Sequence, residues 1–201
     1  MAQQTAGQAA AGKRVDIIGI TLKKVPAGEP GIHEFQVWGG YSFFSSNGVW
    51  GKTPDSQLGI MGLRYNRKWF RLENNTLEYS LDFNLFAKYV YPEYTRTRER
   101  TSLSGVGLAP AGFQFNFNSD KTLQPFLKAS GGFLYLSRPF PDDRGIQFNF
   151  TLELGGGLEY VMSRHSSFTF GYKYHHMSNG EIGVINPGVD SNMFYVGVTI
   201  F

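Results

Sequence analysis

The chain has 201 residues, which suits one domain, and a formal net charge of +3, which is too small to indicate a nucleic-acid partner. Aromatic residues make up 16% of the chain, which also contains 25 Gly. This composition favours β-structure, because aromatic side chains fit pleated surfaces and Gly is costly inside helices. Polar or charged residues interrupt every apolar run before it reaches the ~18 residues that a membrane-spanning helix requires. A membrane form of this chain must therefore be a β-barrel.

Residues 1–31 precede the first clear strand, and the sequence leaves their structure open. Met1 to Ala11 are mostly small and polar and lack the apolar centre of an export signal, so we expect the numbered chain to be a mature form. Val15 to Leu22 is apolar enough to form either a short strand or a plug. We therefore expect an N-terminal segment of uncertain structure over 1–31 and a barrel over 32–201.

Two segments alternate between apolar and polar residues, which is the pattern of a β-strand with two different faces. In 145–161 the apolar positions are even: Ile146, Phe148, Phe150, Leu152, Leu154, Leu158 and Tyr160. In 77–91 the apolar positions are odd: Leu77, Tyr79, Leu81, Phe83, Leu85, Ala87, Tyr89 and Tyr91. Both segments exceed the roughly 9–11 residues that a barrel strand needs to cross a membrane. We expect the apolar face of each to contact lipid.

The same pattern predicts eight strands, and bacterial barrels made of one chain have an even number. The predicted strands lie near 32–44, 57–71, 76–90, 102–118, 122–137, 145–162, 166–178 and 191–201. Pro110 interrupts the fourth, where we expect a β-bulge. The predicted fold is therefore all-β, an eight-stranded antiparallel transmembrane β-barrel.

The connections between the predicted strands alternate in length. Tight turns are expected at 73–75, 119–121 and 163–165, and longer loops at 45–56, 92–101, 138–144 and 179–190. Short periplasmic turns opposite long outer loops are typical of the Gram-negative outer membrane, and they place both termini in the periplasm.

The end of the chain supports the same location. Residues Phe194 to Phe201 form a strand rich in β-branched residues with a terminal Phe, and this resembles the C-terminal signal by which outer-membrane proteins are recognised for assembly. The alternative is a soluble lipocalin-like barrel, whose apolar face would point inward. The many aromatic residues near the ends of the predicted strands favour the membrane barrel.

The predicted strand 166–178 carries candidate catalytic residues near its outer end. Its aromatic residues alternate so that they share a face with His176 and Ser178, while Lys173 and His175 lie on the opposite face. We expect His175 to be an interior residue rather than a ligand. With the aromatic face toward lipid, His176 and Ser178 are neighbours on the outer wall, where the imidazole could take a proton from the hydroxyl.

A third group would be needed to orient that imidazole, and either Glu181 or Asp190 in the following loop could supply it. The alternative reading of the His-x-Ser pair is a polar rim at the membrane interface. The residues alone favour this structural alternative, because the pair is a weak signal.

The segment Tyr174-His175-His176-Met177-Ser178-Asn179, followed by Asn186-Pro187-Gly188 and the closing strand, resembles the PagL family of outer-membrane lipid A 3-O-deacylases. That family carries a His-x-Ser-Asn motif, then an Asn-x-Gly and an acidic residue before the last strand. The similarity extends upstream through Gln124–Gly132 and Gly155–Tyr160. It covers roughly the C-terminal half of the chain, and the N-terminal half only by strand pattern.

The resemblance implies a serine esterase that removes the acyl chain ester-linked at position 3 of lipid A. It makes Ser178 the nucleophile, His176 the general base and Asp190 the orienting acid of a Ser-His-acid triad. Asn179 and Asn186 match the asparagines of the motif and would hold the oxyanion or shape the loop. No cofactor is implied, and without Cys or His-rich spacing the sequence indicates no metal site.

The expected partners are lipid A or lipopolysaccharide and the outer membrane, with no nucleic acid. Oligomeric state and acyl-chain preference stay open. Two other functions compete with the esterase. A non-enzymatic small barrel for adhesion or envelope stability would keep every strand but would have no use for His176 beside Ser178. A soluble lipid-binding barrel would leave the membrane without detergent.

Overall fold

The computed structural model describes residues 14–17, 20–26, 29, 31–45, 48–93 and 99–201. Within these ranges the secondary structure consists of antiparallel strands, and no helix is long and apolar enough to span a membrane. The strands are β1 Arg14–Ile17, β2 Ile20–Lys24, β3 His33–Ser42, β4 Gln57–Leu72, β5 Asn75–Pro92, β6 Arg100–Asn116, β7 Leu123–Phe140, β8 Ile146–Ser163, β9 Ser166–Ser178 and β10 Val189–Ile200.

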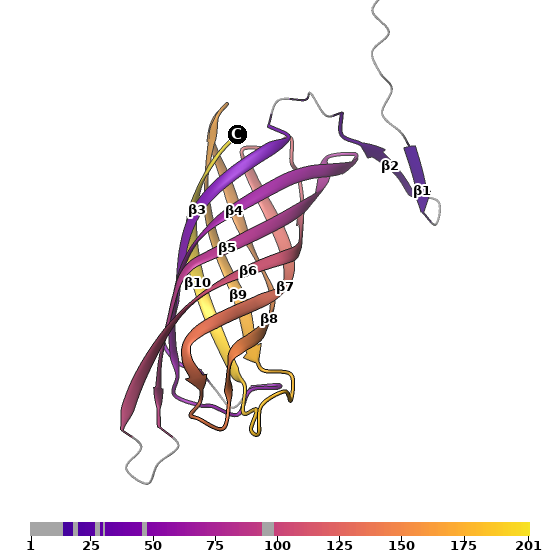
Figure 1. Cartoon of the computed structure of the whole chain (residues 1–201). Helices are drawn as coiled ribbons and strands as arrows, with labels where there is room; N and C mark the ends of the chain where they lie inside the picture. The colour runs from indigo at the N-terminus through magenta and orange to yellow at the C-terminus, as the bar shows by residue number, and fades with distance from the viewer. Residues whose placement is uncertain (1–13, 18–19, 27–28, 30, 46–47, 94–98) are drawn as a thin grey trace, which may run out of the picture.

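Strands β3 to β10 form a closed ring (Figure 1). Each pairs with the next along the chain, and β10 closes the ring by pairing with β3, for example Phe194 with Tyr41. Every pairing is antiparallel. Closure leaves no free sheet edge, so the backbone groups of the wall are hydrogen-bonded within the wall. The predicted eight-stranded antiparallel barrel is confirmed.

The strand ends agree with the predicted ones to within a few residues. Three short connections, after β4, β6 and β8, lie at one end of the barrel together with the C-terminus (Figure 1). We call this the turn end. The connections after β3, β5, β7 and β9 lie at the other end, which we call the loop end.

The N-terminal segment contains β1 and β2, which pair with each other. β2 also pairs with the turn end of β4, through Lys23 with Arg71 and Lys24 with Phe70. The hairpin lies outside the ring and does not enter the barrel (Figure 1). Of the two alternatives for Val15–Leu22, the described residues of this range, 15–17 and 20–22, form short strands. The division of the chain at residue 32 remains a prediction, and residues 1–13 and 18–19 lie outside the described residues.

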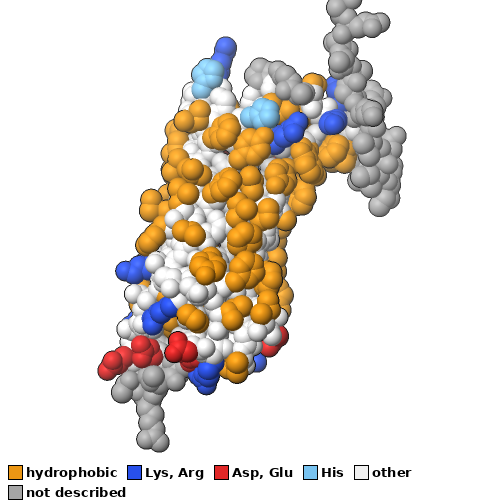
Figure 2. Space-filling view, viewed as in Figure 1, with side chains coloured by type: hydrophobic (Ala, Val, Ile, Leu, Met, Phe, Trp, Pro, Cys, Tyr) orange, Lys and Arg blue, Asp and Glu red, His pale blue; other side chains and the backbone are white. Residues whose placement is uncertain are grey.

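The barrel wall carries its apolar side chains outside (Figure 2). On β8, Phe150, Leu152 and Leu154 are exposed, whereas Thr151 and Glu153 between them are buried in the interior. On β9 the same alternation exposes the aromatic residues and buries Lys173 and His175. An apolar outer face around a polar interior is the reverse of a soluble barrel, and it matches the predicted faces.

The prediction for the strand over 77–91 is wrong in its second half. Phe83 and Leu85 face outward as expected, but Ala87, Tyr89 and Tyr91 are buried inside the barrel. The register shifts between Asn84 and Ala87 on the β6 side. Such a shift inserts an extra residue into the strand, and one extra residue exchanges the two faces of everything beyond it.

The bulge expected at Pro110 is confirmed. The β6–β7 register shifts between Leu108 and Ala111. Proline lacks the N–H that a ladder needs, so it sits where the pairing is interrupted. Its carbonyl oxygen still accepts a hydrogen bond from the Tyr79 hydroxyl at 2.5 Å.

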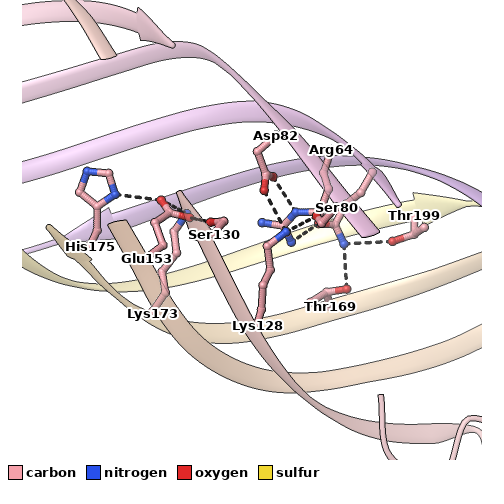
Figure 3. A network of polar contacts seen from close by, with 11 residues as sticks. Arg64, Ser80, Asp82, Lys128, Ser130, Glu153, Thr169, Lys173, His175 and Thr199 are labelled. Atoms are coloured by element: carbon pink, nitrogen blue, oxygen red, sulfur yellow. Dashed lines mark hydrogen bonds and ion pairs between the residues drawn. The ribbon is translucent and has the colours of Figure 1, made fainter. Parts of the chain in front are cut away.

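Buried charges fill the middle of the barrel (Figure 3). Arg64 and Lys128 contact the two oxygens of Asp82 at 2.6 and 2.8 Å. Glu153 contacts Lys173 at 2.7 Å and His175 at 2.8 Å. His175 is therefore an interior residue, as the alternation predicted.

Toward the loop end, the interior of the barrel is filled by apolar side chains. They are completely buried and come from the loop-end parts of several strands: Leu58, Ile60, Tyr89, Leu134, Leu136, Met177, Val189 and Met193. This cluster fills the barrel interior near the loops, so the strands that carry the candidate residues are packed on their inner side.

Candidate active site

His176 and Ser178 lie on the outward face of β9, next to the loop end. Alternation along the strand determines this, since Met177 between them is completely buried in the interior. Across the ladder to β8, His176 pairs with Leu152 and Ser178 pairs with Phe150. Both candidate residues are therefore presented outside the barrel wall, level with its outer rim.

Asp190 stands directly opposite His176 on β10. Paired residues of an antiparallel ladder point to the same face, with Cβ atoms about 5 Å apart. The Asp190 Oδ1 atom lies 2.6 Å from the His176 Nδ1 atom, and the side chain of Asp190 is completely buried. Because a carboxylate can only accept, Nδ1 carries the proton and Nε2 is left with its lone pair.

The other oxygen of Asp190 is held by the connection between β3 and β4. Asp190 Oδ2 accepts hydrogen bonds from the backbone N–H groups of Trp50, at 3.0 Å, and Gly51, at 2.8 Å. The indole ring of Trp50 lies edge-on to the His176 imidazole, with ring centres 5.4 Å apart. Trp50 and Gly51 were not predicted as site residues, and the Gly48-Val49-Trp50-Gly51 stretch is the sequence feature that could have indicated them.

A pocket of about 490 Å³ opens over these residues. His176 and Ser178 both line it, so the structure brings the two predicted residues to one cavity on the outer wall. The remaining lining residues come from β8 and the connections after β3 and β9: Val49, Trp50, Lys52, Leu152, Glu181, Asn186 and Gly188. The walls thus combine exposed apolar side chains with a few polar groups, as small-molecule sites do.

The two asparagines differ in their contacts. Asn179 is buried, and its side-chain nitrogen donates to the carbonyl of Ile185 at 2.8 Å. Its backbone N–H donates to Asn186 Oδ1 at 2.9 Å. Asn186 lines the pocket, and its side-chain nitrogen donates to Glu181 Oε1 at 3.2 Å. Asn179 therefore shapes the loop, whereas Asn186 presents an amide to the cavity.

Glu181, the other acidic candidate, lies at the pocket edge in an exposed position. Its backbone φ is +65°, the left-handed region that residues other than Gly adopt infrequently. Among the hydrogen bonds of the described residues, its carboxylate accepts from Asn186. The structure thus brings Asp190, rather than Glu181, into contact with the imidazole.

The turn Asn186-Pro187-Gly188 packs against the imidazole. Gly188 has φ +61°, and a Cβ atom there would lie 3.2 Å from His176 Cε1. The backbone N–H of Lys52 donates to the carbonyl of Pro187 at 2.6 Å. This bond joins the connection after β3 to the connection after β9 next to the pocket.

The ligand-type side chains of the described residues are not arranged for metal binding. In the part of the chain that the structure describes, no three His, Asp or Glu side chains are grouped so that they could hold a metal ion. The arrangement provides a hydroxyl and an imidazole in one pocket, with the imidazole hydrogen-bonded to a buried carboxylate. These are the groups of nucleophilic acyl transfer.

A family model matches most of the chain. The family model described as "Lipid A 3-O-deacylase (PagL)" matches residues 59–199, a range that contains His176, Ser178 and Asp190. No curated protein matches the chain.

Two solved structures are similar in fold. The structure titled "outer membrane enzyme PagL" shares 17% identity with a TM-score of 0.61, over 81% of this chain and 97% of that one. The outer membrane protein OprG from Pseudomonas aeruginosa shares 11% identity with a TM-score of 0.51, over 86% of this chain and 97% of that one. At these identities the likeness concerns the fold alone, which is that of outer-membrane barrels.

Proposed function

The chain belongs to the PagL family of lipid A 3-O-deacylases, and on this premise we propose that it hydrolyses the acyl ester at position 3 of lipid A in the Gram-negative outer membrane. One observation carries the proposal. His176, hydrogen-bonded to the buried Asp190 at 2.6 Å, shares an outward-facing pocket with Ser178. A structural polar rim would not require a buried carboxylate behind its histidine.

In the proposed reaction the Ser178 hydroxyl attacks the ester carbonyl, and its proton passes to Nε2 of His176. The tetrahedral intermediate collapses with release of the sugar 3-hydroxyl, which receives that proton, and leaves an acyl group on Ser178. Water then attacks this second ester with His176 again as base, releasing the fatty acid and restoring the serine. Asp190 holds the imidazole in the tautomer that both steps require and stabilises the imidazolium.

Asn186 is the proposed donor to the developing oxyanion. Its side-chain oxygen accepts from the Asn179 N–H, and the residue lines the pocket. One of its hydrogens is bonded to Glu181, which leaves the second for the substrate. A donor fixed in this way costs no reorganisation when charge develops.

The position of the pocket suits a lipid substrate. It opens on the outer wall at the loop end, beside the exposed side chains of Val49, Trp50 and Leu152. The ester of an outer-leaflet glycolipid lies at this depth, between the sugar and the acyl chains. The substrate could therefore react without withdrawal of its chains from the membrane.

The test is hydrolysis by purified protein in detergent. Lipid A would be supplied to wild type, Ser178→Ala, His176→Asn and the double variant, and the released fatty acid would be identified by mass spectrometry. We expect wild type to release a 3-hydroxy fatty acid. Each single variant should lose about 10⁴-fold or more in kcat, and the double variant little beyond that, because the hydroxyl and its base act as one unit.

Ser102→Ala is the matched control, since Ser102 is an exposed serine at the loop end of β6 outside the pocket. It should hydrolyse lipid A as wild type does. A folded Ser178→Ala protein that still releases the fatty acid at the wild-type rate would refute the assignment. A wild-type protein that releases none would favour the non-enzymatic barrel instead.

A further inference from the structure

The connection between β3 and β4 covers Asp190 completely. Residues Gly48 to Lys52, which we call the clamp segment, pass over the carboxylate on the outer side of the wall. Although Asp190 belongs to the outward face of β10, none of its side chain is exposed. An ionised carboxylate in this position requires hydrogen-bond donors, because burial without them is costly.

The clamp segment supplies two of those donors from its backbone. The N–H groups of Trp50 and Gly51 both bond to Oδ2, at 3.0 and 2.8 Å, while His176 bonds to Oδ1 at 2.6 Å. The two oxygens are thus held from opposite sides. This fixes the plane of the carboxylate, and through it the direction of the imidazole.

Two glycines let the clamp segment approach so closely. A Cβ atom on Gly48 would lie 2.0 Å from Asp190 Oδ2, and one on Gly51 would lie 2.5 Å from the Asp190 backbone nitrogen. Contacts under about 3 Å between such atoms are not tolerated, so a methyl group at either position must move the segment or the carboxylate. The spacing Gly-x-x-Gly therefore follows from contact with Asp190.

The segment is hydrogen-bonded within itself and to the connection after β9. At its start, the Gly48 N–H donates to the Gly51 carbonyl at 3.2 Å, and at its end the Lys52 N–H donates to the Pro187 carbonyl at 2.6 Å. Just before it, Ser45 is buried and pairs with Ser191, the residue after Asp190. The position of the two donors is thus determined by contacts on both sides of Asp190.

We infer that the clamp segment, through the backbone N–H groups of Trp50 and Gly51 and the small size of Gly48 and Gly51, orients Asp190 and so sets the rate of the reaction. The inference rests on the proposed function and adds Gly48 and Gly51 as positioning residues, since neither touches the reacting atoms. The rate depends on them because a displacement of about 1 Å in a catalytic group can cost 10²-fold.

Kinetics of Gly51→Ala and Gly48→Ala test the inference. We expect kcat to fall about 10²-fold and KM for lipid A to change much less, because the clamp segment forms only part of the pocket wall, through Val49, Trp50 and Lys52. Combined with Asp190→Asn, the alanine changes should cause no further loss, because they act through Asp190. Equal losses in both backgrounds, or an unchanged kcat in both alanine variants, would overturn the inference.

Gly131→Ala on β7 is the matched control. A Cβ atom there would meet nothing nearer than the Thr151 carbonyl oxygen at 3.9 Å, so this variant should behave as wild type. Retained barrel structure in each variant would be checked by its circular dichroism and its heat-dependent migration in gels. These measurements separate a displaced carboxylate from a misfolded protein.

Proton NMR in detergent micelles gives a readout that is independent of hydrolysis. The Nδ1–H proton of His176, bonded to a buried carboxylate, should give a strongly downfield resonance that His176→Asn removes. We expect Gly51→Ala and Gly48→Ala to abolish it and Gly131→Ala to keep it. Persistence of the resonance at its wild-type position in both clamp variants would overturn the inference, whereas an inactive wild type that shows it would refute the proposed function alone.

Discussion

Asp190 is a buried carboxylate whose oxygens require hydrogen-bond donors from the surrounding residues. It is buried on the lipid-facing side of a barrel wall, and its two oxygens receive three N–H groups from two separate parts of the chain. Charge-assisted hydrogen bonds of this kind are stronger than neutral ones. The carboxylate is therefore fixed before any substrate arrives.

At the scale of single residues, Asp190→Asn and Glu181→Gln should have very different effects. We expect Asp190→Asn to lower kcat by several orders of magnitude, because an amide can present its N–H to the imidazole and favour the wrong tautomer. Glu181→Gln should change kcat little, since Glu181 contacts Asn186 rather than His176. Initial rates of fatty-acid release would be measured for both. The opposite ranking would transfer the orienting role to Glu181.

Strand β8 shows how a single element serves two environments. Its outward face is apolar along its length, while its inward face carries Glu153 in the charged interior. Toward the loop end the outward face also forms part of the candidate site, because Leu152 pairs with His176 and lines the pocket. One side of the strand therefore contacts lipid over most of its length and the candidate site at its end.

Leu158→Arg tests the lipid-facing side of this element. Leu158 lies about midway between Leu152, which is level with the site, and Ser163, where the strand ends at a turn. An Arg on the lipid face at the bilayer midplane costs roughly 2–4 kcal/mol. We expect this variant to insert poorly into lipid vesicles, as measured by the fraction that reaches the folded form in gels.

Val184→Arg is the control for that experiment. Val184 is 85% exposed in the connection after β9, so the same side chain is added outside the barrel wall. It should insert as wild type does. If Leu158→Arg also inserts normally, the assignment of the outward face of β8 to lipid is wrong.

At the scale of the whole molecule, the middle of the barrel interior contains two neighbouring groups of charges. Asp82 forms ion pairs with Arg64 and Lys128, and Glu153 contacts Lys173 and His175 (Figure 3). Ion pairs in a closed interior are weak evidence for net stabilisation, but removal of one partner leaves an uncompensated charge. Here loss of the Asp82 carboxylate would leave Arg64 and Lys128 without their shared anion.

Asp82→Asn should therefore destabilise the barrel by about 3–5 kcal/mol. Asp120→Asn is the comparison, because Asp120 pairs with Lys121 at 3.2 Å on the surface of a turn; it should change stability by less than about 1 kcal/mol. Urea unfolding of both variants in lipid vesicles, followed by tryptophan fluorescence, would give the free energies of unfolding. Equal stability of the two variants would show that the interior charges do not stabilise the fold in this way.

The amino-acid sequence by itself determined the eight strands, the tight turns, the bulge at Pro110 and the outward direction of His176 and Ser178. It could do so because side chains along a strand alternate with a period of two, and a barrel in lipid requires one apolar face. The same rule failed beyond Asn84, where a bulge exchanged the two faces of β5. Alternation alone does not show where an extra residue enters a strand.

Only the tertiary structure decided which groups surround the imidazole. Both Asp190 and Glu181 follow His176 closely in the chain, and their distances to it depend on the β9–β10 register and on the path of the loop between them. Trp50 and Gly51 lie 140 and 139 residues before Asp190, yet their backbone N–H groups donate to its carboxylate. Backbone donors have no side-chain signature, so their role arises only when closure of the barrel brings β3 beside β10.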